Sequence, residues 1–143
     1  MIHEKEPKNF YSRFDVVSVL VEYDGKILLL HRQDHKPEGG TWCLPAGKVD
    51  SGEDLAHAMS RELLEETGIM IDPRDLKYHR MWFVTFPTYE FRYHIFSTSV
   101  KNLPNVSINN NEHKAFCWKS PVEALHMNLI QDEDTCLKLH YNI

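Results

Sequence analysis

The sequence of 143 residues has only three cysteines and no long apolar run. Cys43, Cys117 and Cys136 are widely spaced, and none forms the C-x-x-C pair of a zinc or redox centre, which predicts reduced thiols in a reducing compartment. Each thiol is expected to be a small buried hydrophobic group, with a single exposed reactive cysteine as the alternative. Apolar runs such as Ile27–Leu30 are far shorter than the ~20 residues of a membrane-spanning helix. We therefore predict no transmembrane segment.

The chain also lacks an excess of positive charge. Its 16 lysines and arginines are outnumbered by 21 acidic residues, which gives a net charge of −5. The basic residues are scattered, so the sequence has no electrostatic footprint for duplex nucleic acid. No secretory signal is recognisable near Met1. We expect a cytoplasmic protein that binds a small molecule rather than duplex nucleic acid or a membrane, and a homodimer is compatible with the sequence.

The length and the ordinary hydrophobic content of 42% predict one globular domain over residues 1–143. Two β-branched, apolar stretches, Phe14–Glu22 and Lys26–His31, flank Asp24-Gly25. An Asp-Gly pair between two such stretches predicts a hairpin with a type I′ turn, because both central residues of that turn need positive φ. Further strands are predicted at Trp42–Pro45, Leu76–Phe86, Tyr89–Val100 and Ala115–Trp118.

Helical periodicity occupies the segment Asp54–Thr67, where four apolar residues share one face. Asp54 is a candidate N-cap, and Gly68 follows the last turn, where a C′ glycine is expected. A second helix is predicted to start at Ser120-Pro121, and a last one to cover Glu133–His140. The chain therefore mixes strands and helices as an α/β protein.

The helix predicted at Asp54–Thr67 carries Glu62, Glu65 and Glu66 within an arc of roughly 100° beside its apolar stripe. Like charges at this spacing destabilise a helix by ~0.2–0.5 kcal/mol per pair, so a cation is expected against them. Carboxylate oxygens are the ligands that Mg²⁺ and Mn²⁺ prefer. The alternative is a solvated acidic face without a ligand.

The surroundings of these carboxylates favour the metal site. Gly47, Glu53 and the segment Arg61–Ile69 match every fixed position of G-x5-E-x7-R-E-U-x-E-E-x-G-U, where U is aliphatic. This is the box of the Nudix hydrolase family, which the chain resembles. The resemblance implies an α/β/α sandwich around a mixed β-sheet. It also implies Mg²⁺- or Mn²⁺-dependent hydrolysis of a nucleoside diphosphate linked to another group, by attack of water on phosphorus.

The resemblance also assigns roles to residues of the box. It implies that Glu62 and Glu66 are the primary metal ligands and that Glu65 is a further ligand or orients the water. The carbonyl group of Ala46 would be another ligand. Arg61 lies one turn from Glu65, can hold its carboxylate and belongs to the catalytic group.

Two other box positions have structural explanations in the sequence. Gly47 would permit a backbone turn near the metal. Glu53 precedes the predicted helix, so we expect a structural ion pair or an interaction with the helix dipole rather than direct ligation.

Two residues outside the box match the subgroup that resembles the MutT pyrophosphohydrolases. Glu112 stands six residues before Trp118, the spacing at which that subgroup has a metal ligand or general base on a loop. Arg32 stands thirteen residues before Pro45, which matches an arginine that contacts substrate phosphate. The alternatives are a surface glutamate in a polar loop and a surface charge at the end of a strand.

The substrate is less well defined by the sequence. Trp42 and Trp82, together with other aromatic residues such as Phe91 and Tyr93, are candidates to stack on a base, although aromatic residues on strands more often belong to the core. The small size and Glu112 favour a nucleoside triphosphate. A nucleotide sugar, a pterin triphosphate and a non-catalytic nucleotide sensor are the alternatives.

Overall fold

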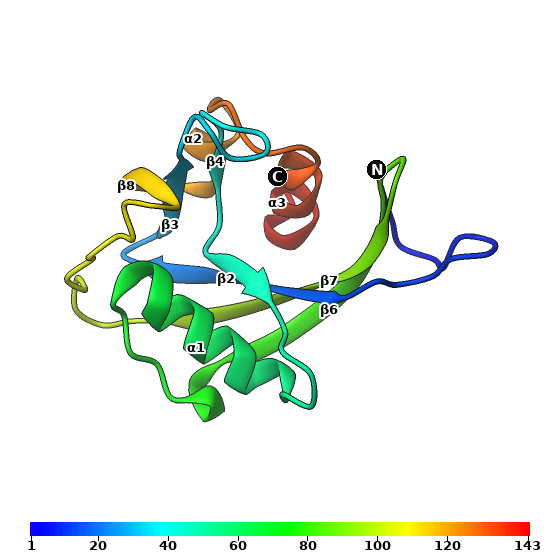
Figure 1. Cartoon of the computed structure of the whole chain (residues 1–143). Coiled ribbons are helices and arrows are strands. Elements are labelled where there is room, and N and C mark those ends of the chain that lie inside the picture. The colour runs from blue at the N-terminus through cyan, green and yellow to red at the C-terminus, as the bar shows by residue number, and fades with distance from the viewer.

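A mixed β-sheet forms the centre of the computed structural model, which describes all residues 1–143 (Figure 1). The strand order is β1-β6-β7-β2-β3-β4, while β5 pairs with β2 and β8 pairs with β3. The only parallel pair is β2 with β7, and all other pairs are antiparallel. The strands are β1 (Ile2–His3), β2 (Asp15–Tyr23), β3 (Lys26–Arg32), β4 (Trp42–Cys43), β5 (Ala46–Lys48), β6 (Lys77–Thr85), β7 (Glu90–Ser99) and β8 (His113–Lys119).

The predicted hairpin is confirmed at the junction of β2 and β3. Asp24 and Gly25 have φ values of 49° and 75°, both positive as a type I′ turn requires. The strand predicted at Trp42–Pro45 is shorter in the structure, where β4 covers only Trp42–Cys43. Ala46–Lys48 form a separate short strand, β5, that pairs with β2 rather than with β3. Pro45 lies between them, and proline cannot donate a backbone hydrogen bond to a sheet.

Helices cover both faces of the sheet (Figure 1). Alternation along β2 separates two cores, since Val19 packs with Leu63 of α1 (Leu55–Thr67), whereas Leu20 packs with Leu137 of α3 (Glu133–Tyr141). The short α2 (Pro121–Ala124) contributes Ala124 to the second core, and a 3₁₀ turn, η1 (Pro73–Asp75), precedes β6. The α/β/α sandwich is therefore confirmed. None of the helices has the length and apolar character needed to cross a membrane.

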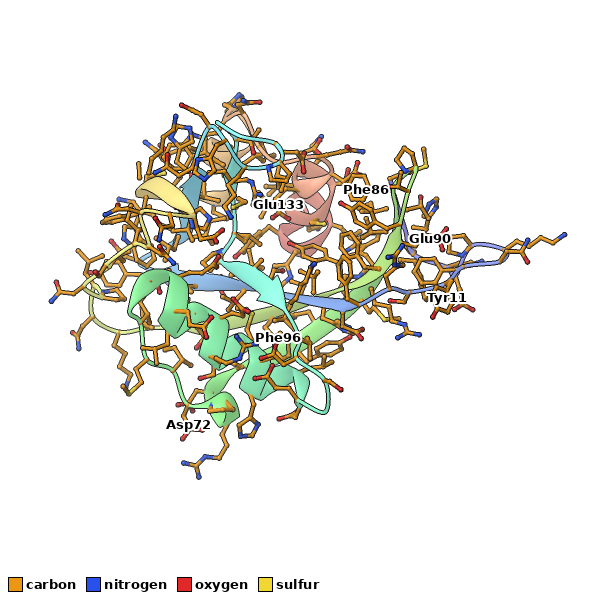
Figure 2. The ribbon with its side chains drawn as sticks, viewed as in Figure 1. Tyr11, Asp72, Phe86, Glu90, Phe96 and Glu133 are labelled. Carbon is orange, nitrogen blue, oxygen red and sulfur yellow. The ribbon has the colours of Figure 1, made fainter.

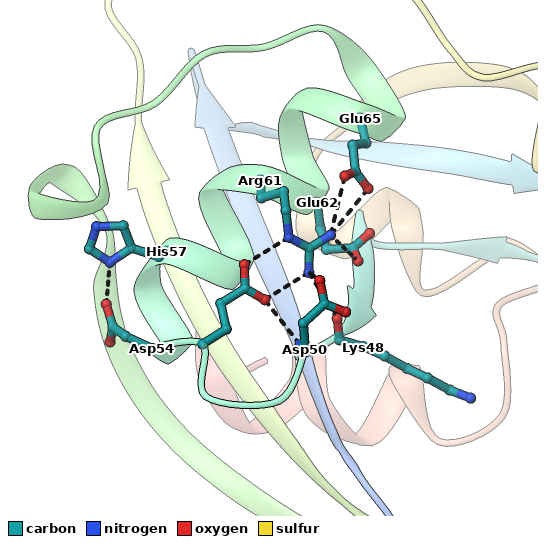
Figure 3. A network of polar contacts seen from close by, with 8 residues as sticks. Lys48, Asp50, Asp54, His57, Arg61, Glu62 and Glu65 are labelled. Atoms are coloured by element: carbon teal, nitrogen blue, oxygen red, sulfur yellow. Dashed lines mark hydrogen bonds and ion pairs between the residues drawn. The ribbon is translucent and has the colours of Figure 1, made fainter.

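The ends of α1 agree only partly with the sequence prediction. Asp54 occupies the N-cap position, but its side chain accepts no capping hydrogen bond and pairs with His57 instead (Figure 3). The predicted side-chain cap is therefore wrong, because a nearby imidazole competes for the carboxylate. Gly68 ends the helix at φ 74°, and its N–H donates to the carbonyl of Leu64.

We predict that Gly68→Ala lowers the free energy of unfolding, measured by urea denaturation, by ~1 kcal/mol, because a Cβ is disfavoured in the left-handed region. A Cβ at this position would meet nothing closer than 3.6 Å, so the cost comes from the backbone. Gly68→Asn should lose less, since asparagine tolerates this conformation. Equal stability of the wild type and Gly68→Ala would contradict this account.

Candidate active site

Arg61 is the centre of an ion-pair network on α1 (Figure 3). Its Nε and Nη2 each donate to one carboxylate oxygen of Glu53 at 2.8 Å, and its Nη1 donates to Glu62 at 3.0 Å and to Glu65 at 3.2 Å. The Arg61 guanidinium lowers the pKa of Glu53 to about 2. The expected structural ion pair of Glu53 is confirmed, and one guanidinium offsets the repulsion among three carboxylates.

Glu62 packs against the backbone of β5 at Gly47. A Cβ built on Gly47 would lie 2.0 Å from Cδ of Glu62, so no side chain fits there while Glu62 keeps its position. Gly47 does not have a positive φ, and it pairs with Val17 in the sheet. The expected turn at Gly47 is therefore wrong, because this position needs glycine for close approach rather than for an unusual φ. Burial raises the pKa of Glu62.

Glu66 contacts the neighbouring residue of the same strand. The N–H of Ala46 donates to Oε1 of Glu66 at 2.8 Å. Burial raises the pKa of Glu66 to about 8, and the charges of Glu62 and Glu112 act in the same direction. Two carboxylates thus meet adjacent positions of β5, in surroundings where each negative charge is poorly solvated.

The other two predicted carboxylates lie apart from this pair. Glu65 is exposed and turns towards Arg61, while Oε2 of Glu112 lies 2.9 Å from Nζ of Lys36. The protein side chains alone do not form a group of three or more acidic, histidine or cysteine residues that could hold a metal ion. The structure therefore brings Glu62 and Glu66 together on β5 and leaves Glu65 and Glu112 outside this contact.

A cavity of about 860 Å³ lies beside this pair of carboxylates, with Glu66, Ala46 and Gly47 in its wall. At one end it is lined by four aromatic side chains, here called the aromatic cluster: Phe14, Phe86, Tyr89 and Phe91. Ring centroids are 5.1 Å apart for Phe14 and Phe91 and 5.2 Å apart for Phe86 and Tyr89. Nζ of Lys48 lies 4.3 Å from the ring centroid of Phe14. This end presents apolar rings with a cation at the edge.

A buried carboxyl group also lines this cavity. Glu133, the first residue of α3, is 2% exposed, and the hydroxyl of Tyr93 donates to its Oε1 at 3.3 Å. Figure 2 shows Glu133 on α3, above the sheet. Burial raises the pKa of Glu133 to about 7. Nothing in the sequence marks Glu133 as a cavity residue, since an acidic residue in the first turn of a helix is ordinarily a surface residue that interacts with the helix dipole.

A different part of the cavity wall is formed by Arg32, Cys43 and His113. Nε of Arg32 donates to the carbonyl of Pro37 at 2.8 Å. His113 is 3% exposed, and its Nε2 lies 3.8 Å from Sγ of Cys43. Burial, followed by the positive charge of Arg32, lowers the pKa of His113 to about 4. The predicted phosphate-binding arginine is thus in the same cavity as Glu66.

The two tryptophans predicted to stack on a base are not in the cavity wall. Trp42 stacks on His31 with ring centroids 4.2 Å apart. Trp82 is 3% exposed in the core beneath α3, and Arg80 covers its ring at 4.4 Å. Phe91 and Tyr93, named with them from the sequence, do line the cavity.

Comparisons with known proteins identify related sequences and folds. The CTP pyrophosphohydrolase of Escherichia coli K12 is 32% identical over 117 residues, which cover 80% of this chain and 82% of that protein. The solution structure of the Escherichia coli ORF135 protein has a TM-score of 0.75 at 28% identity, covering 90% of this chain and 89% of the other. The MutT protein of Methanosarcina mazei Go1 shares the fold, with a TM-score of 0.79, 24% identity and coverage of 90% and 93%.

The family model for the NUDIX domain matches residues 12–139. This range contains the complete box from Gly47 to Ile69 and the contacts of Glu62 and Glu66 with β5. Homologues in this family are named pyrophosphohydrolases, and they hydrolyse nucleoside diphosphates that are linked to another group. The chain is a hydrolase that belongs to the Nudix family.

Proposed function

We propose that the chain hydrolyses a nucleoside triphosphate to a nucleoside monophosphate and pyrophosphate, with Mg²⁺ or Mn²⁺ as cofactor. The observation that supports this proposal most is the single cavity that joins Glu66 to the aromatic cluster. Carboxylates at one place would hold the phosphates through a metal, and apolar rings at another would hold a base. A nucleotide has both of these parts.

The residues on β5 and α1 fit a divalent ion. Glu62 and Glu66 offer hard oxygen ligands, and the missing side chain at Gly47 provides the space that the Glu62 carboxylate occupies. Burial makes both carboxylates costly without a cation, as their raised pKa values show. When bound, the ion would neutralise charge on phosphoryl oxygens and lower the pKa of a water molecule. Carbonyl oxygens such as that of Ala46 and water molecules can complete such a site.

Protein residues would position the other reactants. Arg61 holds Glu65 in place, so Glu65 could orient water or join the metal site. Arg32 would contact a phosphate from the cavity wall. Glu112 would leave Lys36 and act as general base or as an additional ligand, which requires a change of partner on its loop.

The aromatic cluster would receive the base. Stacking on aromatic rings suits any nucleobase, because every base has a π face. Glu133 and Tyr93 supply polar atoms in the same cavity, where they can pair with the edge of the base. The similarity to a CTP pyrophosphohydrolase makes CTP the first substrate to test.

The proposed function is tested by incubating the protein with Mg²⁺ and nucleoside triphosphates, nucleotide sugars, ADP-ribose, dinucleoside polyphosphates and dihydroneopterin triphosphate. We expect release of pyrophosphate and a nucleoside monophosphate, with the highest kcat/KM for a nucleoside triphosphate. Release of a sugar phosphate as the main reaction would assign the alternative substrate class. Tight nucleotide binding without any turnover would instead indicate a sensor domain and would refute the proposal.

The metal role of Glu66 predicts that Glu66→Gln lowers kcat by ~10²-fold or more, because it removes a charge that holds the metal. Glutamine can still accept the hydrogen bond from Ala46, so the melting temperature should be preserved. Isothermal titration with Mn²⁺ should show weaker binding. Glu4→Gln, which changes a carboxylate near Arg80 and outside the cavity, is the matched control. Normal turnover of Glu66→Gln would rule out the ligand role.

The Lys36–Glu112 ion pair allows a sharp test of Glu112. If Glu112 is the general base, Glu112→Gln should lower kcat by ~10²-fold or more and alter the acidic limb of the pH–rate profile, with Mn²⁺ binding retained. Lys36→Met removes the same ion pair and keeps the carboxylate. Equal kcat values for the two variants would show that Glu112 acts only through its ion pair with Lys36.

A further inference from the structure

His113 is a buried polar residue in the cavity wall that the reaction described above does not use. It begins β8 and pairs with Arg32 of β3, next to an irregularity of register between His31 and Arg32. It is 3% exposed, and its Nδ1 has no hydrogen-bond partner. A buried polar atom without a partner costs ~1–3 kcal/mol, so it calls for an explanation.

The contacts of Cys43 determine whether Nδ1 of His113 is a hydrogen-bond donor or an acceptor. Sγ of Cys43 donates its hydrogen to the carbonyl of Leu30 at 3.6 Å. The sulfur can then accept from Nε2–H of His113, which lies 3.8 Å away. A neutral imidazole with its hydrogen on Nε2 has a free lone pair on Nδ1. His113 therefore presents an acceptor that only a donor group can satisfy.

The chemistry of a nucleotide limits what this donor can be. Phosphate oxygens at neutral pH are almost entirely acceptors, and they would be drawn to Arg32 and to the metal. The base would lie among the rings of the aromatic cluster, whereas His113 lies beside Arg32 and Cys43. The remaining donors of a nucleotide are the hydroxyl groups of its sugar.

We propose that His113 is a specificity-determining residue whose Nδ1 accepts a hydrogen bond from a sugar hydroxyl of the substrate. This inference rests on the proposed function, since it assigns a substrate group to the same cavity. In the nucleoside triphosphate of the proposed function the hydroxyl belongs to the ribose, and in the alternative substrate class it belongs to a sugar esterified to the far phosphate. The chemistry of recognition is the same in both cases. A substrate that lacks the hydroxyl leaves Nδ1 unpaired and is bound less well in the transition state.

The first test compares kcat/KM for CTP, 2′-deoxyCTP and 3′-deoxyCTP, and for ADP-ribose and an analogue with a deoxygenated terminal ribose. One neutral hydrogen bond corresponds to about three- to tenfold in kcat/KM, so the wild type should prefer the hydroxylated member of one set by that factor. A preference within the CTP set assigns the nucleoside ribose, and a preference within the ADP-ribose pair assigns the far sugar. His113→Phe keeps a ring of similar size and should abolish the preference, whereas His113→Asn, which retains an acceptor, should keep part of it.

A second test observes the acceptor atom directly in the wild-type protein, so it does not depend on the folding of a variant. ¹⁵N spectra of the protein with labelled histidine are recorded with and without α,β-methylene-CTP and Mg²⁺. The 2′-deoxy and 3′-deoxy forms of the same analogue are the controls. The Nδ1 signal of His113 should move upfield with the hydroxylated analogue and stay in place with the matching deoxy analogue.

Several outcomes would overturn the inference: no preference in the wild type, the same preference in His113→Phe, or, where the preference lies within the CTP set, a Nδ1 signal that responds equally to both analogues. These outcomes are distinct from failure of the proposed function. If no nucleotide is hydrolysed, the proposed function is refuted, while the spectra still report whether a bound nucleotide donates to His113.

Discussion

The contact between two partly buried carboxylates and the backbone of β5 is the constraint on which the site depends. Glu62 occupies the space in which Gly47 would otherwise carry a side chain, and Glu66 accepts from the N–H of Ala46. Both are on α1, so the helix must pack closely on β5. Close packing also brings the two negative charges together in poorly solvated surroundings, which is unfavourable unless positive charge is near. Arg61 provides such charge on the outer side, where it also binds Glu53 and Glu65.

The sheet topology explains how one cavity can be lined by both carboxylates and aromatic side chains. β2 pairs with β5 through Val16–Ser18 and lies parallel to β7 over Asp15–Glu22. The carboxylates that contact β5 and the aromatic residues of β7 are therefore separated by one strand, although they are far apart in the sequence. α3 covers the other face of the sheet and adds Glu133 to the cavity wall (Figure 1). The site is thus assembled from segments that meet only in the folded chain.

This assembly determines which features could be predicted from the sequence. The turn at Asp24-Gly25, the C′ glycine of α1 and the spacing of Glu62 and Glu66 are local features, because they depend on residues within a few turns of one another. The aromatic cluster and Glu133 are brought together by strand pairing and by the docking of α3, and no spacing in the sequence encodes this proximity. Trp82 was wrongly predicted for a related reason. An aromatic residue on a strand has the same sequence pattern whether its side chain lies in the core, as that of Trp82 does, or lines a cavity.

Three polar side chains with little access to solvent lie in the cavity wall, and their position has a physical consequence. Glu66, Glu133 and His113 each lose solvation there without full compensation from the protein. Burial alone does not mark a binding group, because Nε1 of Trp82 also lacks a partner and lies outside the cavity. Glu66, Glu133 and His113 differ from Trp82 in that they line the cavity. Interactions that the folded chain leaves incomplete become available to a substrate, so the cost of burial in the free protein favours binding of a molecule that completes them.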